Sequence, residues 1–141
     1  MSTILQVLLG SAALCLCAVW HIFALSELIF RLRARFENRT WSARGNFPVT
    51  VLIFLAILFA HTAQLYFWAG SFWLLGALPA FQDALYFSLV TYTTLGYGDI
   101  VVGEGFRVFA AMEAITGVLM FGISTAFLVG YFSEMMRSRL Q

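Results

Sequence analysis

Three long apolar runs dominate this chain and limit what it can fold into. They extend from about Ile4 to Phe30, from Phe47 to Trp68 and from Phe106 to Met136. Each is long enough to cross a bilayer, which takes about 20 mainly apolar helical residues. Of the 141 residues, 62% are hydrophobic and 11% are charged. A soluble fold of this size could not bury so much apolar surface. We therefore expect an all-α integral membrane protein with three transmembrane helices.

The rest of the composition excludes several classes of function. The net charge of +1 gives no reason to expect a nucleic-acid partner. Cys15 and Cys17 lie two residues apart in the first run, on different faces of a helix, so neither a shared metal nor a mutual disulfide is expected. No basic region precedes the first run, and arginines follow it where a signal peptide would have a cleavage site. We interpret it as a retained helix.

A shorter apolar piece, Phe81 to Thr93, lies between the second and third runs. It is too short to cross the membrane, so we interpret it as a re-entrant helix followed by irregular chain. Irregular backbone at membrane depth is tolerated only where it is buried in protein or lines a water-filled cavity. The sequence TYTTLGYGD, Thr91 to Asp99, is therefore a candidate lining of an aqueous path.

Basic residues predict the orientation. They gather between the first and second runs and after the third, and because such residues stay on the cytoplasmic side, three crossings place the N-terminus outside and the C-terminus in the cytoplasm. The TYTTLGYGD stretch then lies on the outer side. The residues concerned are Arg31, Arg33, Arg35, Arg39, Arg44, Arg137 and Arg139.

Two glycines suit the TYTTLGYGD stretch to ion coordination. Carbonyl oxygens can replace the hydration shell of an alkali cation without trapping the ion. To aim several consecutive carbonyls at one axis, alternate residues need dihedral angles that side chains normally forbid and glycine allows. Gly96 and Gly98, on either side of Tyr97, have the required spacing.

The seven residues from Thr93 to Asp99 resemble the selectivity-filter signature of the tetrameric potassium channel family. Leu95 stands where valine is more usual, a mild departure because the backbone carbonyl is the ligand. The resemblance implies a pore-loop, two-transmembrane-type pore domain preceded by an extra N-terminal helix, and a homotetrameric pore. It also implies K⁺ as the transported ion, carbonyl-based selectivity and a bacterial inner membrane.

The resemblance assigns roles residue by residue. The backbone carbonyls of Thr94, Leu95, Gly96 and Tyr97 would bind K⁺, and the Thr94 hydroxyl would close the innermost site. The Tyr97 ring would brace the filter. The remaining members are Gly98 within the filter, Asp99 at the outer mouth, and Thr93, Tyr86 and Phe87 as support. The Tyr86 hydroxyl would donate a hydrogen bond to Asp99. In the alternative interpretation, the Tyr86 and Phe87 rings only pack against the filter.

The third run carries the expected cavity and gate. Phe121 to Ala126 resembles the cavity-lining segment of the simplest bacterial channels, and Gly117 falls at the hinge position of the family. Close helix packing would explain a glycine at 117 as well as a hinge does. Gly122, Thr125 and Val129 complete the expected cavity and gate.

These assignments divide the chain as follows. The N-terminal transmembrane helix covers residues 1–30, an arginine-rich cytoplasmic linker 31–46, the pore domain 47–136 and a cytoplasmic tail 137–141. Within the pore domain we expect an outer helix at 47–70, a pore helix at 81–93, the filter segment at 94–99 and an inner helix at 105–136. The first helix is expected outside the second, between subunits.

Several polar residues inside the apolar runs have competing interpretations. The arginines after the first run are spaced by two and follow the span, so they set topology and are not a voltage sensor. Glu113 is expected to be hydrogen-bonded near the pore helix, with proton sensing as the alternative. His61 and Gln64 share a helix face and suggest a hydrogen-bonded pair, with a ligand role as the alternative. His21 could contact another subunit.

We conclude that the chain is a potassium-selective channel that conducts passively, with weak or no voltage sensing. The alternatives are a less selective monovalent cation channel and a non-conducting modulatory membrane subunit. No enzyme constellation and no organic cofactor are expected. Membrane lipids are expected partners, and the sequence leaves open whether another protein regulates the channel.

Overall fold

The structure, a computed structural model, describes residues 1–36 and 43–137, and every regular element in these ranges is helical. The long helices are α1 (Thr3–Phe36), α2 (Ala43–Leu74) and α4 (Arg107–Arg137). A short helix, α3 (Phe81–Tyr92), and a 3-10 turn, η1 (Glu104–Phe106), connect α2 to α4. The three long helices are each long and apolar enough to cross a membrane. The predicted all-α membrane protein is therefore confirmed.

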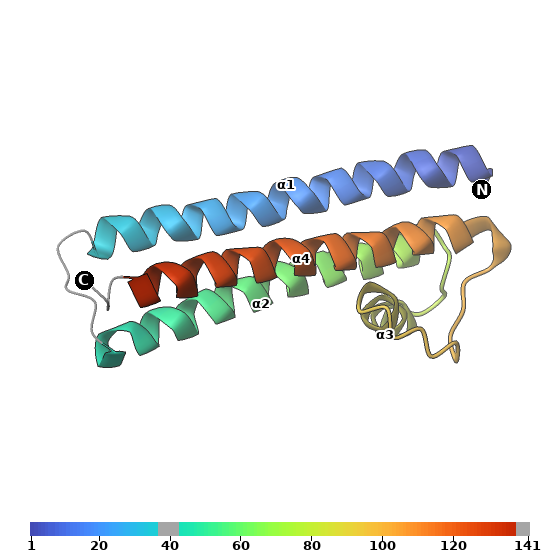
Figure 1. Cartoon of the computed structure of the whole chain (residues 1–141). Coiled ribbons are helices and arrows are strands. Elements are labelled where there is room, and N and C mark those ends of the chain that lie inside the picture. The colour runs from blue at the N-terminus through green and yellow to red at the C-terminus, as the bar shows by residue number, and fades with distance from the viewer. Residues whose placement is uncertain (37–42, 138–141) are drawn as a thin grey trace.

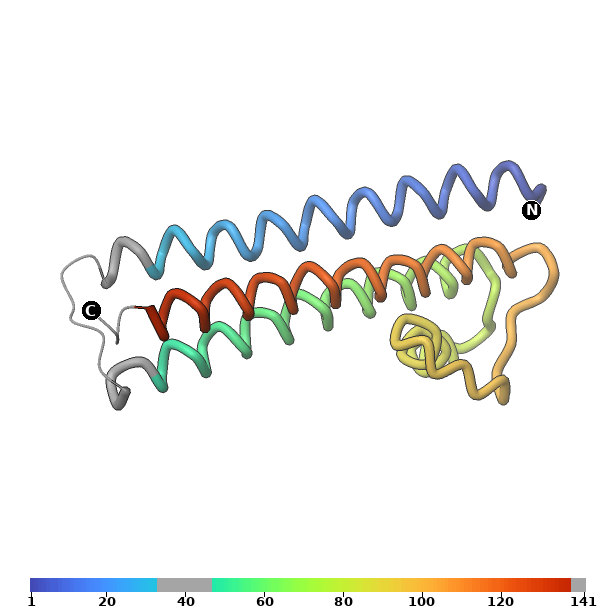
Figure 2. Tube along the Cα trace, in the orientation of Figure 1, coloured from blue at the N-terminus to red at the C-terminus, as the bar shows by residue number. Residues whose placement is uncertain are grey.

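The long helices lie side by side, and α3 lies at the end of the bundle where the N-terminus is found (Figure 1). Beyond α3 the chain makes an irregular excursion before it turns back into α4 (Figure 2). Gly76 ends α2 with a positive φ of 73°, and Ala77 N donates to Phe72 O at 2.9 Å. This left-handed cap satisfies a terminal carbonyl of α2 and lets the chain turn toward α3.

Helix boundaries differ from the expected ones mainly at the linker. Since α1 continues to Phe36 and α2 begins at Ala43, part of the predicted 31–46 linker is helical. Its middle, with Arg39, and the tail beyond Arg137, with Arg139, lie outside the described residues. The outer helix extends to Leu74, four residues past the predicted end.

The position of α1 differs from the sequence-based expectation. It contacts both α4 and α2 of its own chain, whereas we expected it outside the second helix. Polar side chains favour this position. Gln6 Oε1 accepts from the backbone N–H groups of Val108, at 3.0 Å, and Phe109, at 3.3 Å. These amides belong to the first turn of α4 and have no partner within their own helix.

Two apolar clusters hold the helices together. The cluster beside α3 includes Trp68, Phe72, Phe87 and Phe109, whose rings contact one another. The second lies farther along the bundle around Leu25, Val49, Ile53 and Ile57. Many other large apolar side chains on the long helices remain exposed in the single chain, as expected for surfaces that face lipid or further subunits.

Candidate ion-conduction site

The filter segment begins where α3 ends. Thr93, the C-terminal cap of α3, has a right-handed backbone with φ −81°, and its hydroxyl donates to Leu89 O at 2.6 Å. Two further backbone bonds fold the following residues against the helix end: Thr94 N donates to Thr91 O at 3.0 Å, and Gly96 N donates to Val90 O at 3.2 Å. The start of the filter segment is thus anchored on the last turn of α3.

Alternate residues of the filter segment have positive φ angles. The values are 60° at Thr94, 58° at Gly96 and 77° at Gly98. The two glycines were expected to supply such dihedrals. Thr94 was not, because a β-branched residue in this region is a genuine outlier. Nothing lies within 4 Å of a Cβ built on Gly96, so the backbone conformation, and not space, calls for glycine there.

The expected hydrogen bond from Tyr86 to Asp99 is present. The Tyr86 hydroxyl donates to Asp99 Oδ2 at 2.7 Å and links α3 to the outer end of the filter segment. This bond holds the pKa of the Asp99 carboxyl below its usual value and raises the pKa of the Tyr86 hydroxyl. Phe87, next to Tyr86, is buried and packs edge-on against Phe72 at 5.1 Å between ring centroids.

The side chains of the filter segment are largely unsupported within one chain. Leu95 is 60% exposed and Tyr97 is 68% exposed. The Tyr97 ring, which was expected to brace the filter, therefore has to find its contacts outside this chain.

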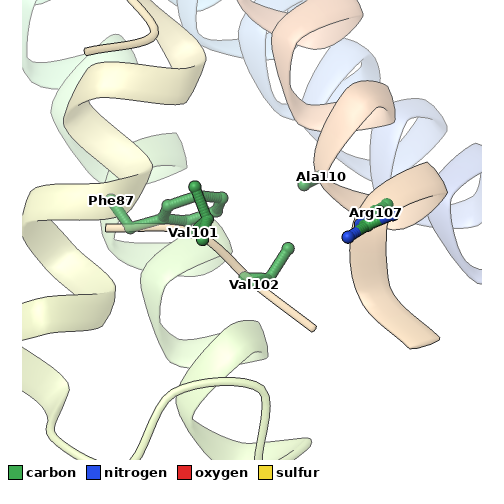
Figure 3. Close-up of a pocket in the computed structure, with 5 residues that line it drawn as sticks. All are labelled: Phe87, Val101, Val102, Arg107 and Ala110. Carbon is green, nitrogen blue, oxygen red and sulfur yellow. The ribbon is translucent and has the colours of Figure 1, made fainter. Parts of the chain in front are cut away.

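A cavity of about 300 Å³ lies between α3, the chain after the filter segment and the start of α4 (Figure 3). Val101 and Val102 line one wall, Phe87 another, and Ala110 and Arg107 the third. Arg107 also lies 3.4 Å from the Glu104 carboxylate. Of these residues, the sequence had singled out Phe87 alone, as support for the filter.

The inner helix α4 meets α3 at Gly117. A Cβ built on Gly117 would lie 2.9 Å from the carbonyl carbon of Tyr92 and closer still to its oxygen. Of the other expected cavity and gate residues, Gly122, Thr125 and Val129 are exposed in the single chain and share a helix face by their spacing. Phe121 is exposed as well, and its ring also packs on the rings of His61, at 4.7 Å, and Tyr92, at 5.5 Å.

Five buried polar side chains form a closed ring of hydrogen bonds in the middle of the bundle. Tyr92 lies in the ring between His61 and Gln64: its hydroxyl donates to Gln64 Oε1 at 2.9 Å, and His61 Nδ1 lies 3.0 Å from the same hydroxyl. Gln64 Nε2 is 2.9 Å from His21 Nδ1. Ser124 Oγ closes the ring at 2.8 Å from His21 Nε2 and 3.0 Å from His61 Nε2.

This polar ring corrects two expectations. His61 and Gln64 are joined through Tyr92 and not directly, because the tyrosine hydroxyl enters from α3 between them. His21, for which contacts with another subunit had been considered, finds both its partners within its own chain. The sequence showed the polar residues inside the apolar runs but not the partner of each.

Glu113 has the hydrogen bond that was expected near the pore helix. The carboxylate is fully buried, and Ser88 of α3 donates its hydroxyl to Glu113 Oε1. The other carboxylate oxygen, Oε2, has no partner among the described residues. Glu113 therefore ties α4 to α3 through Ser88.

Comparison with known proteins identifies the family. Residues 47–134, more than half of the chain, match the family model described as "Ion channel". The chain is 30% identical over 109 residues to the voltage-gated potassium channel Kch of Escherichia coli, an alignment covering 77% of this chain and 26% of that protein. It is 38% identical over 72 residues to potassium channel subfamily K member 18 of Rattus norvegicus, covering 50% and 16%.

A putative potassium channel protein of Rhodopseudomonas palustris is 34% identical over 65 residues, which cover 45% of this chain and 15% of that protein. The chain thus spans about a quarter or less of the length of these relatives. No solved structure matches it significantly. The family match, the potassium channel relatives and the three membrane-spanning helices point to a channel and not to an enzyme. The chain is an integral membrane protein that belongs to the pore-loop potassium channel family.

Proposed function

We propose that this protein conducts K⁺ passively and selectively through a homotetrameric pore. The K⁺ ligands are the backbone carbonyls of Thr94, Leu95, Gly96 and Tyr97, and the Thr94 hydroxyl closes the innermost site. The observation that carries the proposal is the run of positive φ angles at alternate residues of the filter segment. When the sign of φ alternates along the chain, successive carbonyl groups can all point to the same side. In an ordinary β-strand, successive carbonyl groups point to opposite sides.

One chain supplies one carbonyl-bearing strand, and an ion without its water needs ligands all around it. Closed cyclic symmetry provides them by repeating the strand around an axis. Two kinds of exposed surface support this assembly: the unsupported Leu95 and Tyr97 side chains, and the exposed α4 face with Gly122, Thr125 and Val129. In the tetramer this face of α4 lines the inner cavity, and Val129 lies where four inner helices converge.

We further propose that the pore domain comprises residues 47–136, and that Asp99 lies at the outer mouth, where its charge attracts cations. The N-terminus lies outside and the C-terminus in the cytoplasm of a bacterial inner membrane, in keeping with the arginines at 31–44 and after residue 136. The relative from Escherichia coli is named as voltage-gated. For the present chain we propose weak or no voltage sensing.

Reconstitution of the purified full chain into liposomes with a potassium gradient tests the function. We expect flux of K⁺ that Na⁺ does not match and that barium blocks. Four-fold symmetric particle averages of the same preparation test the assembly. Equal flux of the two ions would favour a less selective cation channel, and no flux from intact tetramers would favour a modulatory subunit.

A further inference from the structure

The polar ring defined above joins α1, α2, α3 and α4. His21 comes from α1, His61 and Gln64 from α2, Tyr92 from α3 and Ser124 from α4. Each of the five is buried, with an exposed fraction of at most 8%. Polar and ionisable groups are costly at membrane depth, so an arrangement that satisfies all of them at once needs a physical explanation.

When both histidines are neutral, each of the hydrogen bonds in the ring has one donor and one acceptor. Tyr92 donates to Gln64 Oε1, so His61 Nδ1 must donate to the Tyr92 oxygen, and bare His61 Nε2 accepts from Ser124. Gln64 Nε2 can only donate, so His21 accepts at Nδ1 and donates from Nε2 to Ser124. Every member donates once and accepts once. Turning over the Gln64 amide reverses the direction and leaves the count unchanged.

The polar ring holds the side chain of Tyr92, the residue at the end of α3 from which the filter segment continues. Tyr92 is the last residue of α3 and stands two positions before Thr94, the first residue of the filter segment and the first there with positive φ. Its carbonyl group is held against Gly117, and its hydroxyl is held by His61 and Gln64. A shift of this side chain would therefore move the end of α3 to which the filter segment is anchored.

If either histidine gains a proton, its new N–H group finds no free acceptor in the ring, because each acceptor already receives a hydrogen bond. One contact would then set donor against donor, unless the Ser124 hydroxyl turned away. The two imidazoles lie 4.9 Å apart between centroids, so their charges would repel. The other titratable groups that act electrostatically on Tyr92 are Cys17 of α1 and Glu113 of α4. Glu113 is already engaged by Ser88.

We propose that His21 of α1 is a positioning residue for the selectivity filter, which acts through the polar ring by fixing Tyr92 when both histidines are neutral. This inference rests on the proposed function, because it concerns the filter of a conducting channel. Helix α1 lies outside the matched residues 47–134. With this role it takes part in ion selection and is more than a membrane anchor.

The test uses the full chain in liposomes, with K⁺ and Na⁺ flux and tetramer stability measured on the same preparations. His21→Leu removes both hydrogen-bonding nitrogens. His21→Gln keeps a donor and an acceptor separated by one carbon, as in imidazole, but cannot be protonated. Thr62→Val is the matched control, because the Thr62 hydroxyl donates to the Leu58 carbonyl of its own helix and has no other hydrogen-bond partner among residues 1–36 and 43–137.

We expect His21→Leu to lower the K⁺ to Na⁺ flux ratio about tenfold, the factor that corresponds to one unsatisfied buried hydrogen bond. His21→Gln and Thr62→Val should keep the wild-type ratio near neutral pH. Acidification from about pH 7 to about pH 4, well below the usual histidine range because a charged imidazole is costly at membrane depth, should lower the ratio in the wild type more than in His21→Gln.

Assembled His21→Leu tetramers with the wild-type flux ratio would overturn the inference. If His21→Leu does not assemble, the acid response decides: identical pH profiles of the wild type and His21→Gln would overturn it as well. A wild-type protein that passes no K⁺, or both ions equally, would instead overturn the proposed function, so the two failures are distinguishable.

Discussion

The carbonyl group of Tyr92 occupies the space that a side chain at position 117 would need. A Cβ on Gly117 would lie 2.9 Å from the Tyr92 carbonyl carbon and 3.2 Å from Cδ1 of its ring, with the oxygen closer than either. Backbone atoms at the end of α3 cannot yield as a flexible side chain would. Close packing of α4 on the pore helix therefore accounts for this glycine without a hinge.

The first prediction concerns Gly117→Ala. We expect it to lower the free energy of unfolding by about 1–3 kcal/mol, the usual cost of overpacking, and to reduce K⁺ flux by displacing the end of α3. Thermal melting of the purified protein and liposome flux measure the two effects. Gly130→Ala is the control on the same helix, because nothing lies within 4 Å of its Cβ position. Normal stability with only an altered open probability would favour the hinge instead.

The second prediction concerns the backbone of the filter segment. Gly96 has φ of 58°, a region that costs other residues about 1–2 kcal/mol. We expect Gly96→Ala to lower K⁺ flux about tenfold, since about 1.4 kcal/mol, within that range, corresponds to this factor. Gly103→Ala should be tolerated, because Gly103 has φ of −62° and open space around its Cβ position. Equal flux in both variants would contradict a φ-based role for Gly96.

Much of this fold follows from local sequence. Apolar runs long enough for a bilayer predict α1, α2 and α4, and the shorter run predicts α3 with irregular chain after it. The positive φ at Gly96 and Gly98 follows from the freedom that glycine alone has. These features depend on the residues themselves or on their near neighbours.

What the sequence did not reveal depends on contacts between distant segments. Thr94 adopts a positive φ although it is β-branched, and its own N–H and that of Gly96 donate to carbonyls in the last turn of α3. His21 and Ser124 are separated by 103 positions, and no periodicity relates them. The rule that buried polar groups find hydrogen-bond partners could have predicted a cluster, but not its ring order.

The third prediction concerns the outer mouth. The bond from Tyr86 keeps the pKa of Asp99 low, so the carboxylate stays charged to a lower pH than usual. The attraction of the charged Asp99 carboxylate for cations is fully present above the ordinary pKa of about 3.9. It is lost as the pH falls through the lowered pKa. We expect Tyr86→Phe to move the midpoint of flux loss on outside acidification to higher pH. Tyr66→Phe, which removes another tyrosine hydroxyl, should leave the midpoint unchanged, and an unmoved midpoint in Tyr86→Phe would count against the bond.

The fourth prediction concerns Glu113. Its side chain is fully buried and bonded to Ser88, so we expect a structural role and no exchange of protons with either solution during gating. Glu113→Gln keeps an oxygen that accepts from Ser88 and should leave the pH–flux curve unchanged. Glu113→Ala should lower tetramer stability by about 1–3 kcal/mol, as for a lost buried hydrogen bond. Glu134→Gln, at an exposed position on α4, is the control, and a shifted curve in Glu113→Gln alone would establish proton sensing.

The last prediction concerns voltage. Between Thr3 and Leu32, the spanning part of α1, the charged side chains are Glu27 and Arg31, and they pair with each other at 2.6 Å in an exposed position. A steep response needs about 3–4 gating charges per subunit, each worth about 2.3 kcal/mol per 100 mV. A tenfold change over 100 mV would already require about 0.6 of a charge to cross, from 1.4 kcal/mol per factor of ten.

We therefore expect conductance to change by less than about tenfold over 100 mV in planar bilayers with symmetric potassium. Arg31→Gln should leave this shallow dependence as it is, because Arg31 lies at the exposed end of the span and moves little charge through the field. A steep conductance–voltage curve that Arg31→Gln flattens would make α1 a sensor. A steep curve that Arg31→Gln leaves intact would place the gating charge elsewhere in the tetramer.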